Sequence, residues 1–110
     1  MRVLFDENVP APLRQALAHH EVKTLQEQGW RGISNGDLVS LADGRFEVLV
    51  LADKNLRYQQ NLGGRRLALV ELPTNRWPLL QPILARIRAT VDQAMPGSYT
   101  VIEPVEPEGG

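Results

Sequence analysis

Short apolar runs alternate with helix-like stretches along this chain, a pattern typical of an α/β domain with a largely parallel sheet. Four consecutive apolar residues at 48–51 lack the polar alternation of a half-exposed strand. They therefore predict a strand buried on both faces at the centre of a parallel sheet. Residues 67–70 repeat this pattern. Three further runs predict strands over residues 3–5, 22–25 and 99–102.

Helices are predicted between these strands from apolar residues at three- and four-residue steps and from residues that favour helix starts. The first follows the first strand and runs over about residues 10–20. A short helix begins at Ser34 or Asn35, either of which can cap it. Asn75 is expected to cap a longer helix that runs to about residue 94. Within it, Pro82 should kink the helix or mark its effective start.

The 110 residues suit one domain. We predict a three-layer sandwich over residues 1–102, with helices on both faces of a central, mainly parallel sheet of four to five strands. Residues 103–110 alternate Pro, Glu and Gly with little to bury, and they predict a disordered acidic tail.

Composition narrows the candidate chemistry. The chain has no cysteine, which excludes disulfides, a thiolate nucleophile and Cys-based metal sites. Its apolar runs are too short to span a membrane and its first residues do not form a signal peptide, so we expect a cytoplasmic protein. The net charge of -1 gives no overall case for nucleic-acid binding. Without the predicted tail, however, 12 basic residues stand against 10 acidic ones.

Acidic residues follow two of the predicted strands. Asp6 comes directly after the first apolar run, and Asp53 comes two residues after Leu51. Sites in open α/β sheets form beyond the carboxyl ends of the strands, so these carboxylates converge if the two strands are neighbours about 4.8 Å apart. Asp37, in the first turn of the short helix, is a candidate third ligand, and Glu7 is a fourth.

Converging carboxylates need a cation to neutralise them. An oxygen-only ligand set suits Mg²⁺ or Mn²⁺ rather than zinc, and it supports metal-assisted hydrolysis of a phosphodiester. The only histidines, His19 and His20, are interpreted as structural residues at the end of the first predicted helix. Taken singly, each Asp is also explained as a helix cap or turn residue.

Basic and polar residues follow Asp53 in a loop-rich segment that we expect beside the acidic crevice. They predict a patch that contacts phosphates, with a tyrosine available to stack on a base. The alternative interpretation is a solvated connection whose charges keep the protein soluble. The residues of the patch are Lys54, Arg57, Tyr58, Arg65 and Arg66.

Three motifs resemble those of a PIN-like family of small bacterial proteins. The opening VLFDENVP at residues 3–10 resembles the family's first motif. GISNGDL at residues 32–38 resembles its second motif, and VLVLADKNL at residues 48–56 resembles its third. The motifs fall in the family's order, and the resemblance covers about residues 1–95.

This resemblance implies a PIN-like fold and Mg²⁺- or Mn²⁺-dependent endoribonuclease activity, often as the toxin of a toxin–antitoxin pair. It implies an RNA substrate, an antitoxin protein encoded nearby and, commonly, a homodimer. Carried over by position, the metal ligands and catalytic residues are Asp6, Asp37 and Asp53. Glu7, Asn8 and Asn55 have supporting positions in the motifs.

Two alternatives stay open. Many family members have Thr, Asp and Asp at the positions of Leu51, Asn35 and Asn55, and these changes favour a catalytically degenerate PIN-like interaction protein. A receiver-like domain that accepts phosphate on Asp53 is the third hypothesis. Such domains use a lysine at the end of the last strand, and residues 99–106 contain none.

Overall fold

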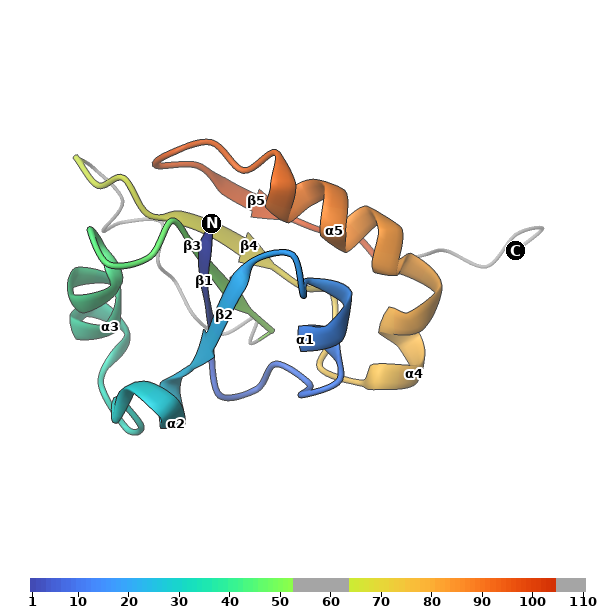
Figure 1. Cartoon of the computed structure of the whole chain (residues 1–110), viewed down its shortest axis with the longest axis horizontal. Helices are drawn as coiled ribbons and strands as arrows, with labels where there is room; N and C mark the ends of the chain where they lie inside the picture. Colours follow the sequence, from blue (N-terminus) through green and yellow to red (C-terminus); the bar gives the residue numbers. More distant parts are fainter. Residues whose placement is uncertain (53–63, 105–110) are drawn as a thin grey trace.

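The computed structural model describes residues 1–52 and 64–104. They form one five-stranded sheet with all strands parallel, in the order β2-β1-β3-β4-β5 (Figure 1). This confirms the predicted α/β fold with a central parallel sheet, and each strand lies within one residue of its predicted bounds. The strands are β1 (Arg2–Phe5), β2 (Glu21–Thr24), β3 (Val48–Leu51), β4 (Ala68–Glu71) and β5 (Tyr99–Val101).

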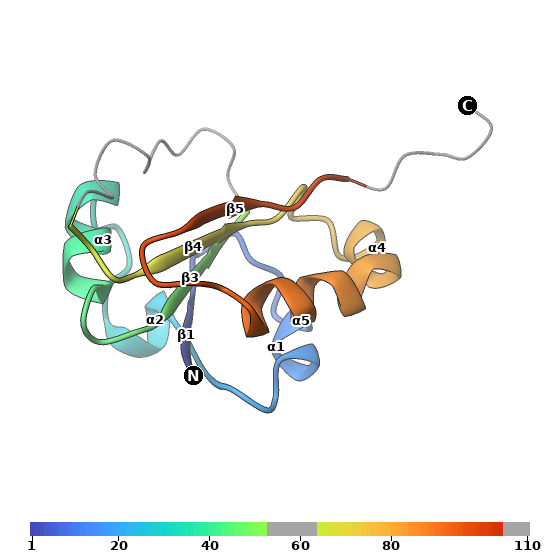
Figure 2. The ribbon, with the colours of Figure 1, turned by 90° about the horizontal axis from the view of Figure 1, so that it is seen from above.

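Helices cover both faces of the sheet and complete three layers. One face packs against the first helix and the last two, and the other packs against the second and third. Figure 2 shows α1, α4 and α5 gathered on the side of the sheet away from α3. The helices are α1 (Leu13–Ala16), α2 (Leu25–Gln28), α3 (Asn35–Ala42), α4 (Trp77–Leu80) and α5 (Leu84–Asp92), with a 3₁₀ turn, η2 (Gln81–Ile83), between the last two.

The core consists of two apolar layers divided by the strands. Val48 and Val50 of β3 pack toward α1, α4 and α5, whereas Leu49 and Leu51 pack toward α2 and α3. All four side chains are fully buried. The uninterrupted apolar run of β3 therefore reflects burial on both faces, as predicted from the sequence.

The helices differ more from the prediction than the strands do. The predicted helix from Asn75 to about residue 94 is divided into α4, η2 and α5, and Pro82 lies inside the 3₁₀ turn, which confirms the predicted interruption at this residue. Proline has no N–H to donate, so a continuous helix loses a hydrogen bond at that position. Asn75 does not cap this segment, because α4 begins after Arg76 and has no side-chain cap. The first helix is also shorter than predicted and ends at Ala16.

The short helix α3 begins as the spacing predicts. Ser34 is its N-cap, and the Ser34 hydroxyl accepts a hydrogen bond from the Asp37 N–H at 3.4 Å. Among the described residues, no helix is long and apolar enough to cross a membrane.

Candidate functional site at the carboxyl edge of the sheet

The strand order brings the end of β1 next to the end of β3. Phe5 pairs with Val50, and the Asp6 N–H donates to the Val50 carbonyl at 2.9 Å. The chain turns to one side of β1 to form β2 and to the other side to form β3, so the switch point of the sheet lies between β1 and β3. Ligand crevices of open α/β sheets form at such a point, beyond the carboxyl ends of the strands.

Asp6 sits in a tight turn at this edge. Its side chain is partly buried, and Oδ1 accepts a hydrogen bond from the Glu7 N–H at 2.8 Å. Its carbonyl accepts from the Val9 N–H at 3.1 Å. The turn therefore fixes the Asp6 carboxylate just beyond the strand rather than on a mobile connection.

Glu7 connects this edge to the segment that leads into α3. Glu7 Oε1 accepts a hydrogen bond from the Gly32 N–H at 3.1 Å. Asp37 is exposed in the first turn of α3, a few residues further along the chain. Asp53 lies outside the described residues. Within residues 1–52 and 64–104, Asp6, Glu7 and Asp37 do not form a group of three whose ligand atoms lie within 4.8 Å of one another.

A carboxylate that the sequence analysis missed extends the same edge. Glu71 is the last residue of β4 and pairs with Leu51 of β3. On the other side of β3, Phe5 pairs with Val50, so the next residue, Asp6, lies beside Leu51. Two strand spacings, about 10 Å, separate Asp6 and Glu71 in this row. The signal was available, because Glu71 directly follows the apolar run 67–70 as Asp6 follows the first run. We call Asp6, Glu7 and Glu71 the acidic edge.

Glu71 is buried, with 9% of its surface exposed. The Tyr99 hydroxyl of the neighbouring strand donates to Glu71 Oε1 at 2.6 Å. Burying a carboxylate is costly unless it is paired or hydrogen-bonded, so this bond offsets part of that cost. Leu51, between the two carboxylates, is fully buried and offers no oxygen.

A cavity of about 460 Å³ opens beside Asp6 at the ends of β1 and β2. Its polar lining includes Asp6, Glu7, Asn8, Arg14 and Arg31. Arg14 is held in place because it donates to the Val22 carbonyl at 2.7 Å and to both Glu27 oxygens at 3.0 and 3.1 Å. The cavity has the size of small-ligand pockets and combines acidic and basic groups.

The pKa of Glu27 is lowered by its hydrogen bond from the Thr24 N–H and by the hydrogen bond from Arg14. Glu27 is thus an ionised partner that neutralises Arg14. Arg31 is exposed at the rim of the cavity, where a phosphate group could reach it.

The predicted basic patch is only partly described, and its described part lies elsewhere. Arg66 donates its N–H to Asp43 Oδ1 at 2.9 Å, and its carbonyl accepts from the Gly97 N–H at 2.9 Å. Arg65 and Arg66 therefore precede β4 at the amino end of the sheet, opposite Asp6. The expectation that they lie beside the crevice is wrong, because a parallel crossover leaves from one end of the sheet and returns to the other. Lys54, Asn55, Arg57 and Tyr58 lie outside the described residues.

The fold and this edge define an α/β domain with carboxylates at the switch point of a parallel sheet. A scan against protein-family models and searches of curated proteins and of solved structures returned no match.

Proposed function

We propose that this protein is a metal-dependent endoribonuclease of the PIN-like type. The observation that carries the proposal is the position of Asp6 at the end of β1, hydrogen-bonded through its N–H to Val50 of β3. Asp53 follows that strand in the sequence, and Glu71 ends the next strand of the sheet. Acidic residues therefore lie at or just beyond the carboxyl ends of three adjacent strands. Among the described residues, Asp6, Glu7 and Glu71 do not form a group of three with ligand atoms within 4.8 Å, so a shared cation would need Asp53 as a further ligand.

The donor chemistry fits Mg²⁺ or Mn²⁺. Asp6 and Glu71 offer carboxylate oxygens, the ligands that these ions prefer, and neither cysteine nor histidine lies among them. We assign Asp6, Asp53 and Asp37 as ligands, with Glu71 as an additional one. A bound ion would supply stabilisation of the charge that develops on the scissile phosphate.

The chain's own residues provide the rest of the site. Glu7 holds the segment before α3 against the end of β1 through Gly32. Arg31, at the rim of the cavity, would contact an RNA phosphate, and Asn8 lines the same cavity. Lys54, Arg57 and Tyr58 follow Asp53 in the sequence and would contact RNA as the motif resemblance implies. That resemblance extends the proposal to a toxin whose partner is an antitoxin protein encoded nearby.

The test is cleavage of a mixed RNA substrate by the purified full chain with Mg²⁺ or Mn²⁺. Asp6→Asn and Asp53→Asn should each lower the rate by at least about 100-fold, because each removes a charged ligand near the reacting phosphate. Glu21→Gln, an exposed carboxylate at the amino end of β2, is the matched control and should cleave normally. Equal cleavage by wild type and both Asn variants would identify a contaminating nuclease and refute the proposal.

One observation favours a degenerate, non-catalytic member instead. Leu51 occupies the middle of the row between Asp6 and Glu71 and brings no oxygen to the acidic edge. Calorimetric titration with Mn²⁺ separates the two functions. Binding that is abolished by Asp6→Asn supports the enzyme, whereas no binding at about millimolar Mn²⁺ leaves an interaction role.

The strand order also matches that of receiver domains, which accept phosphate on an aspartate at this switch point. The chain has no lysine in β5 or in the residues that follow it. Incubation with acetyl phosphate distinguishes this function. A phosphate that stays on Asp53 at neutral pH and is released in acid would favour a receiver domain over a ribonuclease.

A further inference from the structure

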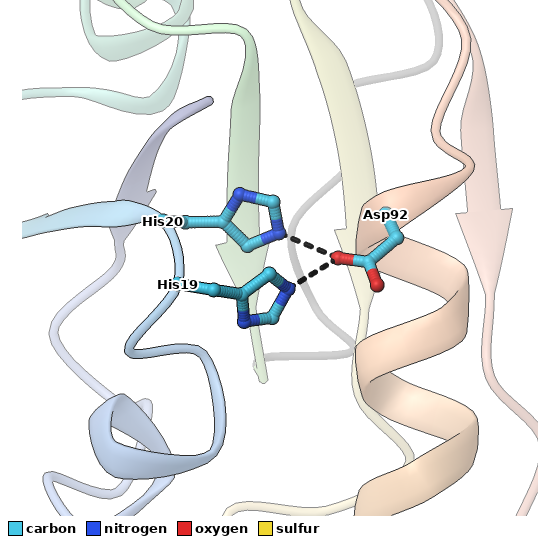
Figure 3. Close-up of side chains that lie close together, drawn as sticks. All are labelled: His19, His20 and Asp92. Carbon is cyan, nitrogen blue, oxygen red and sulfur yellow. Dashed lines mark hydrogen bonds and ion pairs between the residues drawn. The ribbon is translucent and has the colours of Figure 1, made fainter.

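Two histidines and an aspartate meet at the amino end of the sheet. His19 and His20 directly precede β2, and Asp92 is the last residue of α5. Nε2 of His19 lies 2.7 Å from Asp92 Oδ1, and Nε2 of His20 lies 2.6 Å from the same oxygen (Figure 3). Two imidazoles that are adjacent in the sequence thus converge on one atom of a distant helix.

The backbone on both sides of this cluster is fixed. The His20 N–H donates to the Leu17 carbonyl at 2.9 Å, which closes the turn after α1. Arg88, one turn before Asp92, donates through Nε to the Ala16 carbonyl at 2.9 Å and holds α5 against the end of α1. The His20 side chain is only 8% exposed. The fold therefore brings the three residues together, with His20 nearly buried and the side chains of His19 and Asp92 46% and 40% exposed.

The donor set differs from that of the acidic edge. One ligand atom from each residue lies within 4.8 Å of the other two. Two imidazole nitrogens with one carboxylate oxygen suit Zn²⁺ and similar transition metals rather than Mg²⁺. Bonds of about 2.0–2.2 Å place tetrahedral ligands about 3.4 Å apart. A shift of under about 1 Å by Asp92, whose side chain is 40% exposed, would admit the ion.

The imidazole protons of His19 and His20 have a place to go when a metal binds. Each Nε2 donates to Asp92 in this arrangement, and binding a metal through Nε2 moves that proton to Nδ1. Nδ1 of His20 lies 3.2 Å from the Met1 nitrogen, which is a donor. Because Met1 is exposed, its nitrogen can turn to water when Nδ1 carries the proton. Nothing in the cluster thus requires a buried charge to remain unpaired.

We propose that His19, His20 and Asp92 bind a divalent transition-metal ion of the Zn²⁺ type, with water at the fourth position. The ion joins the turn after α1 to the end of α5, two segments that are 72 residues apart in the sequence. The site lies at the opposite end of the sheet from the acidic edge and does not depend on the proposed nuclease function.

The test uses the full chain without a histidine tag. Calorimetry with ZnCl₂ on the Asp6→Asn variant, which removes a proposed ligand of the acidic edge, should show one saturable site, and Co²⁺ should give the visible absorption of a low-symmetry, four-coordinate centre. Zn²⁺ at about 100 times its dissociation constant should raise the melting temperature by roughly 10 °C.

Two variants assign the ligands. Asp92→Asn keeps an oxygen that accepts from both imidazoles, and His20→Gln keeps a side-chain N–H donor, so both should retain the metal-free fold. Each should weaken Zn²⁺ binding by at least about tenfold, with a circular dichroism spectrum like that of wild type. Glu21→Gln, a carboxylate next to His20, and Asp6→Asn, at the acidic edge, are the controls and should bind Zn²⁺ normally.

Two results would overturn this proposal. One is wild-type binding that appears only above about 100 µM Zn²⁺. The other is unchanged Zn²⁺ affinity in Asp92→Asn. Failure of the nuclease assay leaves the site intact, because neither experiment measures RNA cleavage.

Discussion

The hydrogen bond between Tyr99 and Glu71 offers the most direct test of the buried carboxylate at the acidic edge. Tyr99→Phe removes only the hydroxyl and leaves the ring packed against the apolar layer under α2 and α3. Glu71 Oε1 then loses a donor at 2.6 Å while its side chain stays buried. Together with Glu71→Gln in a thermodynamic cycle, the substitution reports how much this bond offsets the cost of burying the carboxylate.

The expected loss is about 1.5–3 kcal/mol, the range for a hydrogen bond to a charged group that is left without its partner. With 9% of Glu71 exposed, water replaces little of the lost bond. In a domain of this size, the loss lowers the melting temperature by roughly 6–15 °C. Urea unfolding followed by circular dichroism gives the free energy of unfolding, and the m value should not change.

Glu71→Gln and the double variant complete a thermodynamic cycle for this pair. Removal of the Tyr99 hydroxyl should cost less in the Glu71→Gln background, because a neutral amide is cheaper to leave unpaired than a carboxylate. A loss below about 0.5 kcal/mol in Tyr99→Phe would refute the reasoning. It would show that water reaches Glu71 in solution, and the carboxylate would then not be positioned in advance for a cation.

The same variants test the proposed ion. If Mn²⁺ binds at the acidic edge, it should restore part of the stability lost in Tyr99→Phe, because the cation gives the Glu71 carboxylate a new partner. It should restore little in Glu71→Gln, which lacks the charged ligand. Equal effects of Mn²⁺ on both variants would place the ion away from Glu71.

Three further changes test the fold. Leu69→Ala, in the buried strand β4, should cost about 2–5 kcal/mol in urea unfolding, and a smaller loss would contradict its full burial. Gly97→Ala should cost about 1–3 kcal/mol in the same assay, because φ is +77° and the new Cβ would lie 2.9 Å from the Arg65 carbonyl. The side-chain hydrogen bond from Arg2 lowers the pKa of Glu47 in the folded protein. The stability that this pair adds is therefore complete above the ordinary pKa of glutamate and is lost as the pH falls through the lowered pKa of the folded state. Glu47→Gln should make the midpoint of urea unfolding depend less on pH across that acidic range. If the midpoint varies with pH as it does in the wild type, the Arg2–Glu47 pair is screened by solvent.

The strands were predictable because a short run of neighbouring residues is enough to identify each one. A parallel sheet covered on both faces requires continuous apolar runs, and β3 and β4 carry them without interruption. The helices were less predictable. The apolar spacing after Asn75 indicated a long helix, and the interruption predicted at Pro82, which has no N–H to donate, is confirmed. The start after Arg76 rather than at Asn75 depends on tertiary packing.

The position of a candidate site residue was predictable only where it depends on a single strand and not on how that strand pairs with others. Asp6 follows β1, and the rule for parallel sheets places it at the carboxyl edge whatever its neighbours are. Glu71 obeys the same rule, but its significance depends on the pairing of β4 with β3, which the sequence does not state. The contact of His20 with Asp92 requires in addition the path of α5 back to the amino end of the sheet.

Arg65 and Arg66 show what the same rule implies for basic residues. A residue that precedes a parallel strand lies at the amino edge, and a residue that follows one lies at the carboxyl edge, so closeness along the chain does not bring the two edges together. Arg66 shares the amino edge with Asp43 and Gly97, a full strand length from Asp6. If RNA binds at the acidic edge as proposed, a basic residue that contacts it there must follow a strand or line the cavity beside Asp6, and Arg31 lines that cavity. Under the proposed function, substitution of Arg31 should weaken RNA binding more than substitution of Arg66, and equal effects would contradict the placement of RNA at this edge.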